Sequence, residues 1–297
     1  MSLSPNLRGA LWMLASAVGF TAMTTLIKFL GEDYPAALQT FYRQLAGAIV
    51  LLPLIARDWR GAFRTTRPGI VIFRSSAGVV ALIMSFYAYQ KLPLADANAL
   101  SFTRTLWLVP LAGLVLREPI GPRRIGAALV GFVGVIIMLQ PGTGSVEAWL
   151  GWPQLCALGA ALLFALTITG MKVMTRDHTP FVLLVYAAVL GLIFSIPPAI
   201  FVWRWPTWPD LGLLAAMGVI GTFTQGAYIK GMEAGEAAVM APIDYTRLVF
   251  AVIVGLLLFH EVPNAATILG AVIVVGSTLF ISWREHQLAK RATLQLE

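Results

Sequence analysis

Long, continuous apolar stretches dominate the hydrophobic pattern of this chain. A helix that crosses a bilayer needs about 20 predominantly apolar residues. Runs of about this length cover residues 9–29, 36–56, 69–90, 95–116, 124–140, 151–173, 180–202, 210–230, 237–258 and 264–283. They lack the strict alternation of apolar and polar residues that a membrane β-strand requires. The pattern therefore predicts an all-α integral membrane protein with ten transmembrane helices joined by short loops.

The composition agrees with a membrane protein and excludes an ordinary soluble one. Hydrophobic residues make up 58% of the 297 residues and charged residues only 12%, and the mean hydropathy is +0.80. A soluble domain carries about 25% charged residues, and disorder requires high charge with low hydrophobicity. Cys156 is alone, so no intrachain disulfide or cysteine-based zinc site is expected.

Lysine and arginine are distributed unequally between the two ends of the predicted spans. One side has only Lys28, Arg43, Lys91 and Arg204, and the other Lys and Arg residues near span ends gather on the opposite side. The positive-inside rule places that basic side, with both the N and the C terminus, in the cytoplasm. The net charge of +7 is thereby explained by topology, and no nucleic-acid partner is expected.

The two halves of the sequence match each other at a nearly constant offset. The matching pairs include Phe20 with Phe164, Thr25 with Thr169, Lys28 with Lys172, Thr103–Arg104 with Thr246–Arg247, and Glu118 with Glu261. An ordered set of matches of this kind indicates an internal repeat. Residues 1–145 and 146–297 would each hold five spans, so the second repeat is inverted relative to the first. Inverted repeats are typical of secondary transporters.

Several motifs resemble those of EamA-type members of the drug/metabolite transporter superfamily. They are Leu92–Pro93–Leu94–Ala95–Asp96–Ala97, Leu116–Arg117–Glu118–Pro119, Gly126 to Gly134 with Pro141–Gly142, and Leu258–Phe259–His260–Glu261. The resemblance covers nearly the whole chain. It implies a substrate cavity lined by spans one, three, four, six, eight and nine, and a carrier of amino acids, other metabolites, vitamins or nucleoside-like compounds. The acids Glu118 and Glu261 are expected to cap or dock the helix that follows each of them.

The chain departs from this family in one proline. Many relatives have a proline near the start of both span four and span nine. This sequence has Pro242 in span nine, whereas Ala99 stands at the matching place and Pro110 lies further along span four. We therefore expect the two halves to bend differently.

Few ionisable side chains lie deep inside the predicted spans, and these are candidate site residues. An arginine at the bilayer centre costs about 3 kcal/mol or more. Arg104 and Arg247 occupy matching places in spans four and nine, and Asp244 is the only acidic residue well inside a span. Three uses stay open: a cationic substrate site, a structural ion pair between Asp244 and Arg247, and a proton site at Asp244.

Polar and aromatic residues at similar depth complete the candidate substrate site. The expected substrate-binding residues are Asn98, Ser101, Arg104, Trp107, Tyr245, Arg247, Tyr87, Gln225 and Tyr228. The arginines and Asn98 would bind polar groups, whereas Trp107 and Tyr245 would contact apolar or aromatic ones. Interhelical hydrogen bonding by the small polar residues and ordinary packing of the aromatic ones are equally open.

These features predict a secondary transporter in a bacterial-type inner membrane that works by alternating access. Export of amino acids, including apolar and aromatic ones, is the favoured activity. Uptake of a vitamin or nucleoside-like metabolite and a non-transporting membrane scaffold are the alternatives. The sequence has no Walker, zinc or nucleophile-elbow motif, so neither an enzyme nor a bound cofactor or metal is expected. Expected partners are a small-molecule substrate and membrane lipid, and both a monomer and an oligomer are compatible with the sequence.

Overall fold

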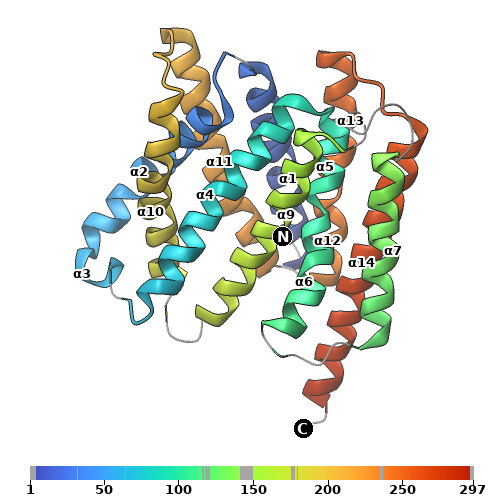
Figure 1. Cartoon of the computed structure of the whole chain (residues 1–297). Helices are drawn as coiled ribbons and strands as arrows, with labels where there is room; N and C mark the ends of the chain where they lie inside the picture. The colour runs from blue at the N-terminus through green and yellow to red at the C-terminus, as the bar shows by residue number, and fades with distance from the viewer. Residues whose placement is uncertain are drawn as a thin grey trace.

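The structure is a bundle of long α-helices (Figure 1). The computed structural model describes residues 5–31, 33–63, 65–115, 117, 121–140, 150–174, 178, 180–234 and 237–294. Within these ranges there is no β-strand, and nine helices are long and apolar enough to cross a membrane. The chain is therefore an all-helical, multi-pass membrane protein, as predicted.

The helices follow the expected spans closely. In the first half they are α1 (Pro5–Leu30), α2 (Ala36–Arg57), the short α3 (Trp59–Ala62), α4 (Pro68–Lys91), α5 (Leu94–Ser101), α6 (Thr103–Leu114) and α7 (Pro122–Leu139). In the second half they are α9 (Trp152–Met174), α10 (Pro180–Phe201), α11 (Trp208–Ala234), α12 (Ala237–Asp244), α13 (Thr246–Phe259) and α14 (Ala265–Leu294). The predicted boundary between residues 145 and 146 lies outside the described residues.

One residue interrupts the helix in each of the predicted fourth and ninth spans, although Pro242–Phe259 still counts as one of the nine membrane-spanning candidates. Phe102 separates α5 from α6, and Tyr245 separates α12 from α13, 143 residues further along the chain. The stretch 95–116 is not among the nine long apolar helices, because Phe102 divides it into helices of 8 and 12 residues. Both interruptions fall at the offset that aligns the two halves.

The two interruptions have the same hydrogen-bond pattern. The N–H of Phe102 donates to the carbonyl three residues earlier at 3.2 Å, and that of Tyr245 does the same at 3.3 Å. The threonine that follows each also donates its hydroxyl to the carbonyl three residues before it, at 2.7 Å for Thr103 and 2.6 Å for Thr246. Threonine back-bonding of this kind bends helices. The hydrogen bonds of the two interruptions therefore match, although Pro242 lies in α12 and Pro110 in α6. Different bending of the two halves stays a prediction.

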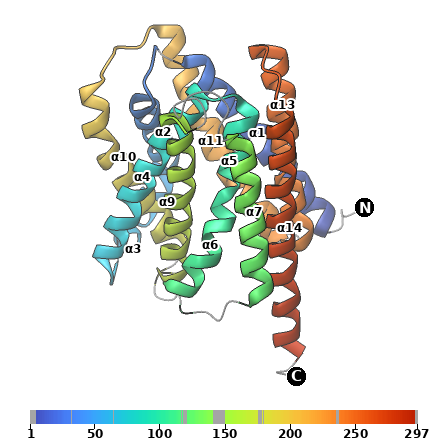
Figure 2. The ribbon, with the colours of Figure 1, turned by 45° about the vertical axis from the view of Figure 1, so that its right-hand side comes forward.

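Helices of the first half pair with helices of the second half. The main pairs are α1 with α11, α4 with α9, α2 with α10, and α7 with α14. The last of these pairs is seen side by side in both ribbon views (Figures 1 and 2). The contact between the halves therefore runs through the whole bundle, and residues of spans four and nine can meet across it.

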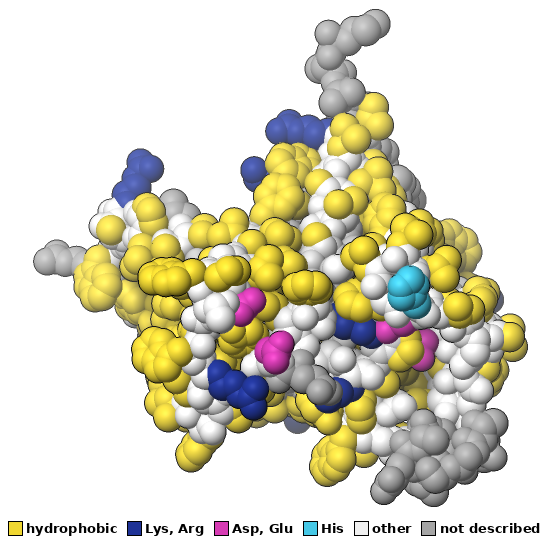
Figure 3. Space-filling view, turned by 90° about the horizontal axis from the view of Figure 1, so that it is seen from above, with side chains coloured by type: hydrophobic (Ala, Val, Ile, Leu, Met, Phe, Trp, Pro, Cys, Tyr) yellow, Lys and Arg dark blue, Asp and Glu magenta, His cyan; other side chains and the backbone are white. Residues whose placement is uncertain are grey.

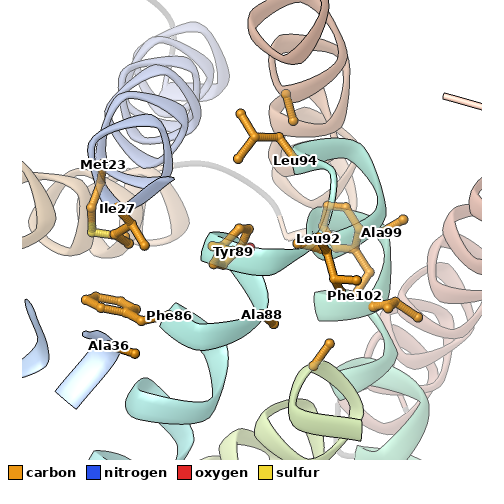
Figure 4. Close-up of a cluster of buried hydrophobic side chains, with 14 of the residues drawn as sticks. Met23, Ile27, Ala36, Phe86, Ala88, Tyr89, Leu92, Leu94, Ala99 and Phe102 are labelled. Atoms are coloured by element: carbon orange, nitrogen blue, oxygen red, sulfur yellow. The ribbon is translucent and has the colours of Figure 1, made fainter. Parts of the chain in front are cut away.

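A buried apolar cluster fixes the first interruption against its neighbours (Figure 4). Met23 and Ile27 of α1 lie near Phe86 of α4, and Tyr89 of α4 lies between α1 and Phe102. All five side chains are at most 6% exposed. Since they come from three separate elements, their packing holds Phe102 in place relative to α1 and α4.

Gly134 permits the close approach of α7 and α14. A Cβ at this position would lie 2.8 Å from the carbonyl oxygen of Gly270, which is backbone and cannot rotate away. We expect Gly134→Val to destabilise the protein by about 1–3 kcal/mol through overpacking, measured as a lower melting temperature in detergent. Gly126→Val is the matched control, because nothing lies within 4 Å of a Cβ there. Equal losses in the two variants would contradict this account.

Candidate substrate site

Two arginines and one aspartate meet beside the helix interruptions. Arg104 is the second residue of α6, Arg247 is the second residue of α13, and Asp244 ends α12. The Oδ2 atom of Asp244 lies 3.7 Å from Nη2 of Arg104 and 3.9 Å from Nη2 of Arg247. We call these three residues the central cluster. Its formal net charge is +1. Asp244 is close to both arginines and is not paired with Arg247 alone.

The two arginines differ sharply in their surroundings. The guanidinium of Arg247 contacts two aromatic rings, with its Cζ 4.1 Å from the ring centroid of Phe102 and 4.8 Å from that of Phe20. Such cation–π contacts stabilise a desolvated cation. Its Nη2 donates to the hydroxyl of Ser101 at 3.5 Å, and its Nε has no partner among the described residues. The Arg247 side chain is 4% exposed, whereas that of Arg104 is 29% exposed.

The two interruption residues contact each other. The rings of Phe102 and Tyr245 are 4.6 Å apart between centroids. The hydroxyl of Tyr245 donates to Oγ1 of Thr278 on α14 at 2.5 Å. Since Phe102 and Tyr245 occupy matching places in the two halves, their rings form a direct contact between the two interrupted spans.

Other predicted site residues lie around the central cluster. Asn98 is 1% exposed, donates to the carbonyl of Leu94 at 2.9 Å, and has an Oδ1 without a partner in the described part of the chain. Tyr228 of α11 is half-buried and interacts electrostatically with Arg247. The structure thus places Ser101 and Tyr228 beside Arg247. Asn98 is connected to the cluster only through Ser101, whose hydroxyl donates to the Asn98 carbonyl at 2.7 Å.

The remaining predicted site residues have other surroundings. Trp107 packs its ring edge-to-face against Phe132 of α7, with 4.8 Å between centroids. Tyr87 is half-buried and packs on the main apolar core. Gln225 is exposed on α11. For these three, substrate contact stays a prediction that the observed contacts do not support.

Three aromatic residues of this site are absent from the expected substrate-binding set. Phe20 and Phe102 enclose Arg247, and Tyr89 packs edge-to-face on Phe20 with 6.1 Å between centroids. Phe102 had one usable signal, because it matches Tyr245 at the repeat offset. Phe20 and Tyr89 contact the site only through tertiary packing.

A second polar cluster lies at one end of the bundle. The ammonium group of Lys28, in the last turn of α1, is paired with the carboxylate of Glu261 and donates to the carbonyl of Leu92 at 2.7 Å. The other carboxylate oxygen of Glu261 accepts from the N–H of Leu94 at 2.8 Å. In the view onto this end, acidic and basic side chains lie next to one another among hydrophobic ones (Figure 3).

Glu261 therefore caps a helix of the other half. The expectation that it caps or docks the helix after it is wrong, because it binds the first N–H of α5, one of the donors that a helix start leaves without an intrahelical partner. His260 adopts a left-handed conformation at φ 55°, and the N–H of Glu261 returns to the carbonyl of Gly255 at 2.9 Å. This turn aims the carboxylate at α5. Glu118, its match in the first half, lies outside the described residues.

The Tyr245 ring and its hydroxyl make separable contributions. We expect Tyr245→Phe to keep transport within about threefold, because it loses one hydrogen bond worth about 1 kcal/mol. Tyr245→Ala removes the contact with Phe102 and leaves a cavity, which costs about 3–5 kcal/mol for a large aromatic side chain. Transport rates normalised to folded protein in liposomes measure both. A larger loss in Tyr245→Phe than in Tyr245→Ala would contradict the packing role.

Comparisons with known proteins agree with this architecture. The sequence pattern of the EamA-like transporter family matches residues 7–140 and again residues 151–283. An "S-adenosylmethionine uptake transporter" of Rickettsia bellii is 30% identical, over 93% of this chain and 94% of its own. A "Riboflavin transporter" of Vibrio cholerae is 28% identical, over 96% of both chains.

A solved structure supports the fold alone. It covers 90% of this chain and 96% of its own, with a TM-score of 0.59 at 18% sequence identity. The family pattern covers the helices of both halves, including both interrupted spans and the central cluster between them. The chain therefore belongs to the EamA-like transporter family of the drug/metabolite transporter superfamily and is a membrane transporter.

Proposed function

We propose that this transporter carries metabolites that join an α-amino-acid group to an apolar or aromatic body, and that S-adenosylmethionine is its substrate. The central cluster is the observation that carries this proposal. It places cationic and anionic groups together beside the rings of Phe102 and Tyr245, between the two halves of the chain. Ligand sites of secondary transporters lie at this kind of interface.

The similarity to known carriers favours S-adenosylmethionine within that class. The resemblance to an S-adenosylmethionine uptake transporter extends over nearly the whole of both chains. S-adenosylmethionine carries an α-amino-acid group at one end and a nucleoside at the other. It thus combines the two substrate classes that the sequence analysis held apart, and uptake becomes the favoured direction.

Export of free amino acids stays the second candidate. The charged groups of the central cluster suit the α-amino and α-carboxyl groups of any amino acid. The two candidates differ in the body of the substrate and in the direction of net movement. A competition experiment can therefore separate them.

The interruptions support an alternating-access mechanism. In this proposal the two repeats, 1–145 and 146–297, cross the membrane in opposite orientations and exchange conformations. The interruptions at Phe102 and Tyr245 have matching hydrogen bonds and lie two residues before Arg104 and Arg247. Bending at both places would open the central cluster to one side of the membrane and close it to the other.

The test is counterflow with purified protein in liposomes. Liposomes loaded with unlabelled S-adenosylmethionine should take up the labelled compound faster than protein-free liposomes. Unlabelled leucine, tryptophan, adenosine and riboflavin are then added outside as competitors. Exchange of S-adenosylmethionine supports the proposal. Exchange of leucine or tryptophan without it would favour the second candidate, and no exchange of any of these compounds would contradict both candidates.

A further inference from the structure

The three members of the central cluster differ in what a ligand can reach. Arg104 has a 29% exposed side chain and makes no hydrogen bond among the described residues. Arg247 has a 4% exposed side chain, and its guanidinium contacts the rings of Phe20 and Phe102. The side chain of Arg104 is therefore the more accessible of the two to a ligand.

The contact between Arg104 and Asp244 is loose. An arginine and a carboxylate in direct contact lie about 2.7–2.9 Å apart and are often bidentate. Here the nearest oxygen of Asp244 is 3.7 Å from Arg104 and 3.9 Å from Arg247. Neither guanidinium is hydrogen-bonded to this carboxylate, so the donors of Arg104 and the acceptors of Asp244 are open to a further ligand.

We infer that Arg104 binds the α-carboxylate of the substrate and Asp244 binds its α-ammonium group, while Arg247 is a positioning residue that fixes Asp244 without touching the substrate. This inference rests on the proposed function for its substrate class. The zwitterionic α-amino-acid group presents a negative carboxylate to Arg104 and a positive ammonium group to Asp244. These two charges cancel, so the group adds no net charge to the cluster. The buried Arg247 places its positive charge 3.9 Å from Oδ2 of Asp244 and so balances the charge of this carboxylate.

The net charge of the cluster predicts that removing the substrate's α-carboxylate weakens binding. A substrate without its carboxylate brings one extra positive charge to a cluster that already has a net charge of +1. It also leaves Arg104 without its partner. We therefore expect decarboxylated S-adenosylmethionine to bind about 100-fold more weakly than S-adenosylmethionine, the usual effect of truncating one partner of a desolvated charge pair.

The experiment compares two ligands across three forms of the full-length protein in detergent. Dissociation constants for S-adenosylmethionine and its decarboxylated form are measured by equilibrium binding, which does not depend on transport. In Arg104→Gln the discrimination should fall from about 100-fold to within about threefold. In Arg247→Lys it should stay near 100-fold while the melting temperature falls, because lysine keeps the charge but loses the planar stacking between the rings.

The outcomes separate this inference from the proposed function. Discrimination that survives in Arg104→Gln, or that disappears in Arg247→Lys, overturns the inference although S-adenosylmethionine is bound. If the wild-type protein binds leucine but not S-adenosylmethionine, the proposed substrate is wrong, and leucine with its decarboxylated amine tests the inference in the same variants. A protein that binds riboflavin but neither amino-acid compound overturns both.

Discussion

Replacing Asp244 with asparagine should reduce transport to the background of protein-free liposomes and markedly lower the melting temperature. The substitution removes the one acid between two guanidiniums and raises the formal charge of the central cluster from +1 to +2. Asp244 is 14% exposed and Arg247 is 4% exposed, so solvent screens this repulsion poorly. Removing one partner of a buried ion pair costs about 3–5 kcal/mol. Thermal unfolding in detergent and counterflow in liposomes measure the two effects.

A second substitution distinguishes charge repulsion from loss of the aspartate itself. In Asp244→Asn combined with Arg104→Gln, the cluster again has a net charge of +1. The double variant should regain most of the lost melting temperature but no transport, because both groups that contact the substrate are absent. Wild-type stability in the single variant would show that the acid does not balance the two arginines.

The proton-site hypothesis for Asp244 predicts a different outcome. A carboxylate that only couples transport to protons is dispensable for exchange, in which no net proton movement is needed. Asp244→Asn would then keep counterflow and lose only the accumulation that a pH gradient drives. Loss of both activities supports the role in substrate binding.

The position of the central cluster could be predicted from the sequence because two independent signals agree. Arg104 and Arg247 match at the repeat offset, and a buried charge is too costly to occur by chance within an apolar span. The cost of a buried charge also identifies Asp244 as a candidate site residue. The sharing of its charge between both arginines could not be predicted, because it depends on how spans four and nine cross.

The interruptions and the aromatic enclosure were harder to predict for physical reasons. Phe102 is apolar and has neither glycine nor proline beside it, so nothing in the local pattern ends the helix there. Thr103 back-bonds beside the interruption, but such a bond is no signal in the sequence, because Thr25 makes a similar one within an unbroken helix. The sequence does not show what Phe20 and Tyr89 face, because their contact with each other depends on how α1 packs against α4.

The other large effect concerns Glu261, whose contacts with Lys28 and Leu94 join the two halves at one end of the bundle. Glu261 follows the end of α13. Its carboxylate contacts Lys28 at the end of α1 and the N–H of Leu94 at the start of α5. A carrier that opens toward this end must separate these elements. We expect Glu261→Ala to lose both contacts, whereas Glu261→Gln keeps an acceptor for the N–H of Leu94 and loses only the charge. The first variant should therefore shift the conformational balance by at least about tenfold, and the second by less.

Cysteine labelling measures this shift directly. Cys156 is changed to serine and Ser101 to cysteine, and the labelling rate by a membrane-impermeant thiol reagent is followed from the side on which Glu261 lies. The rate should rise about tenfold in Glu261→Ala and less in Glu261→Gln. Lys230→Met is the control for loss of a charge, because Lys230 lies over the ring of Trp12 at 4.7 Å and not at this end. An unchanged rate in a folded Glu261→Ala protein would mean that the contact caps α5 but does not hold the two halves together.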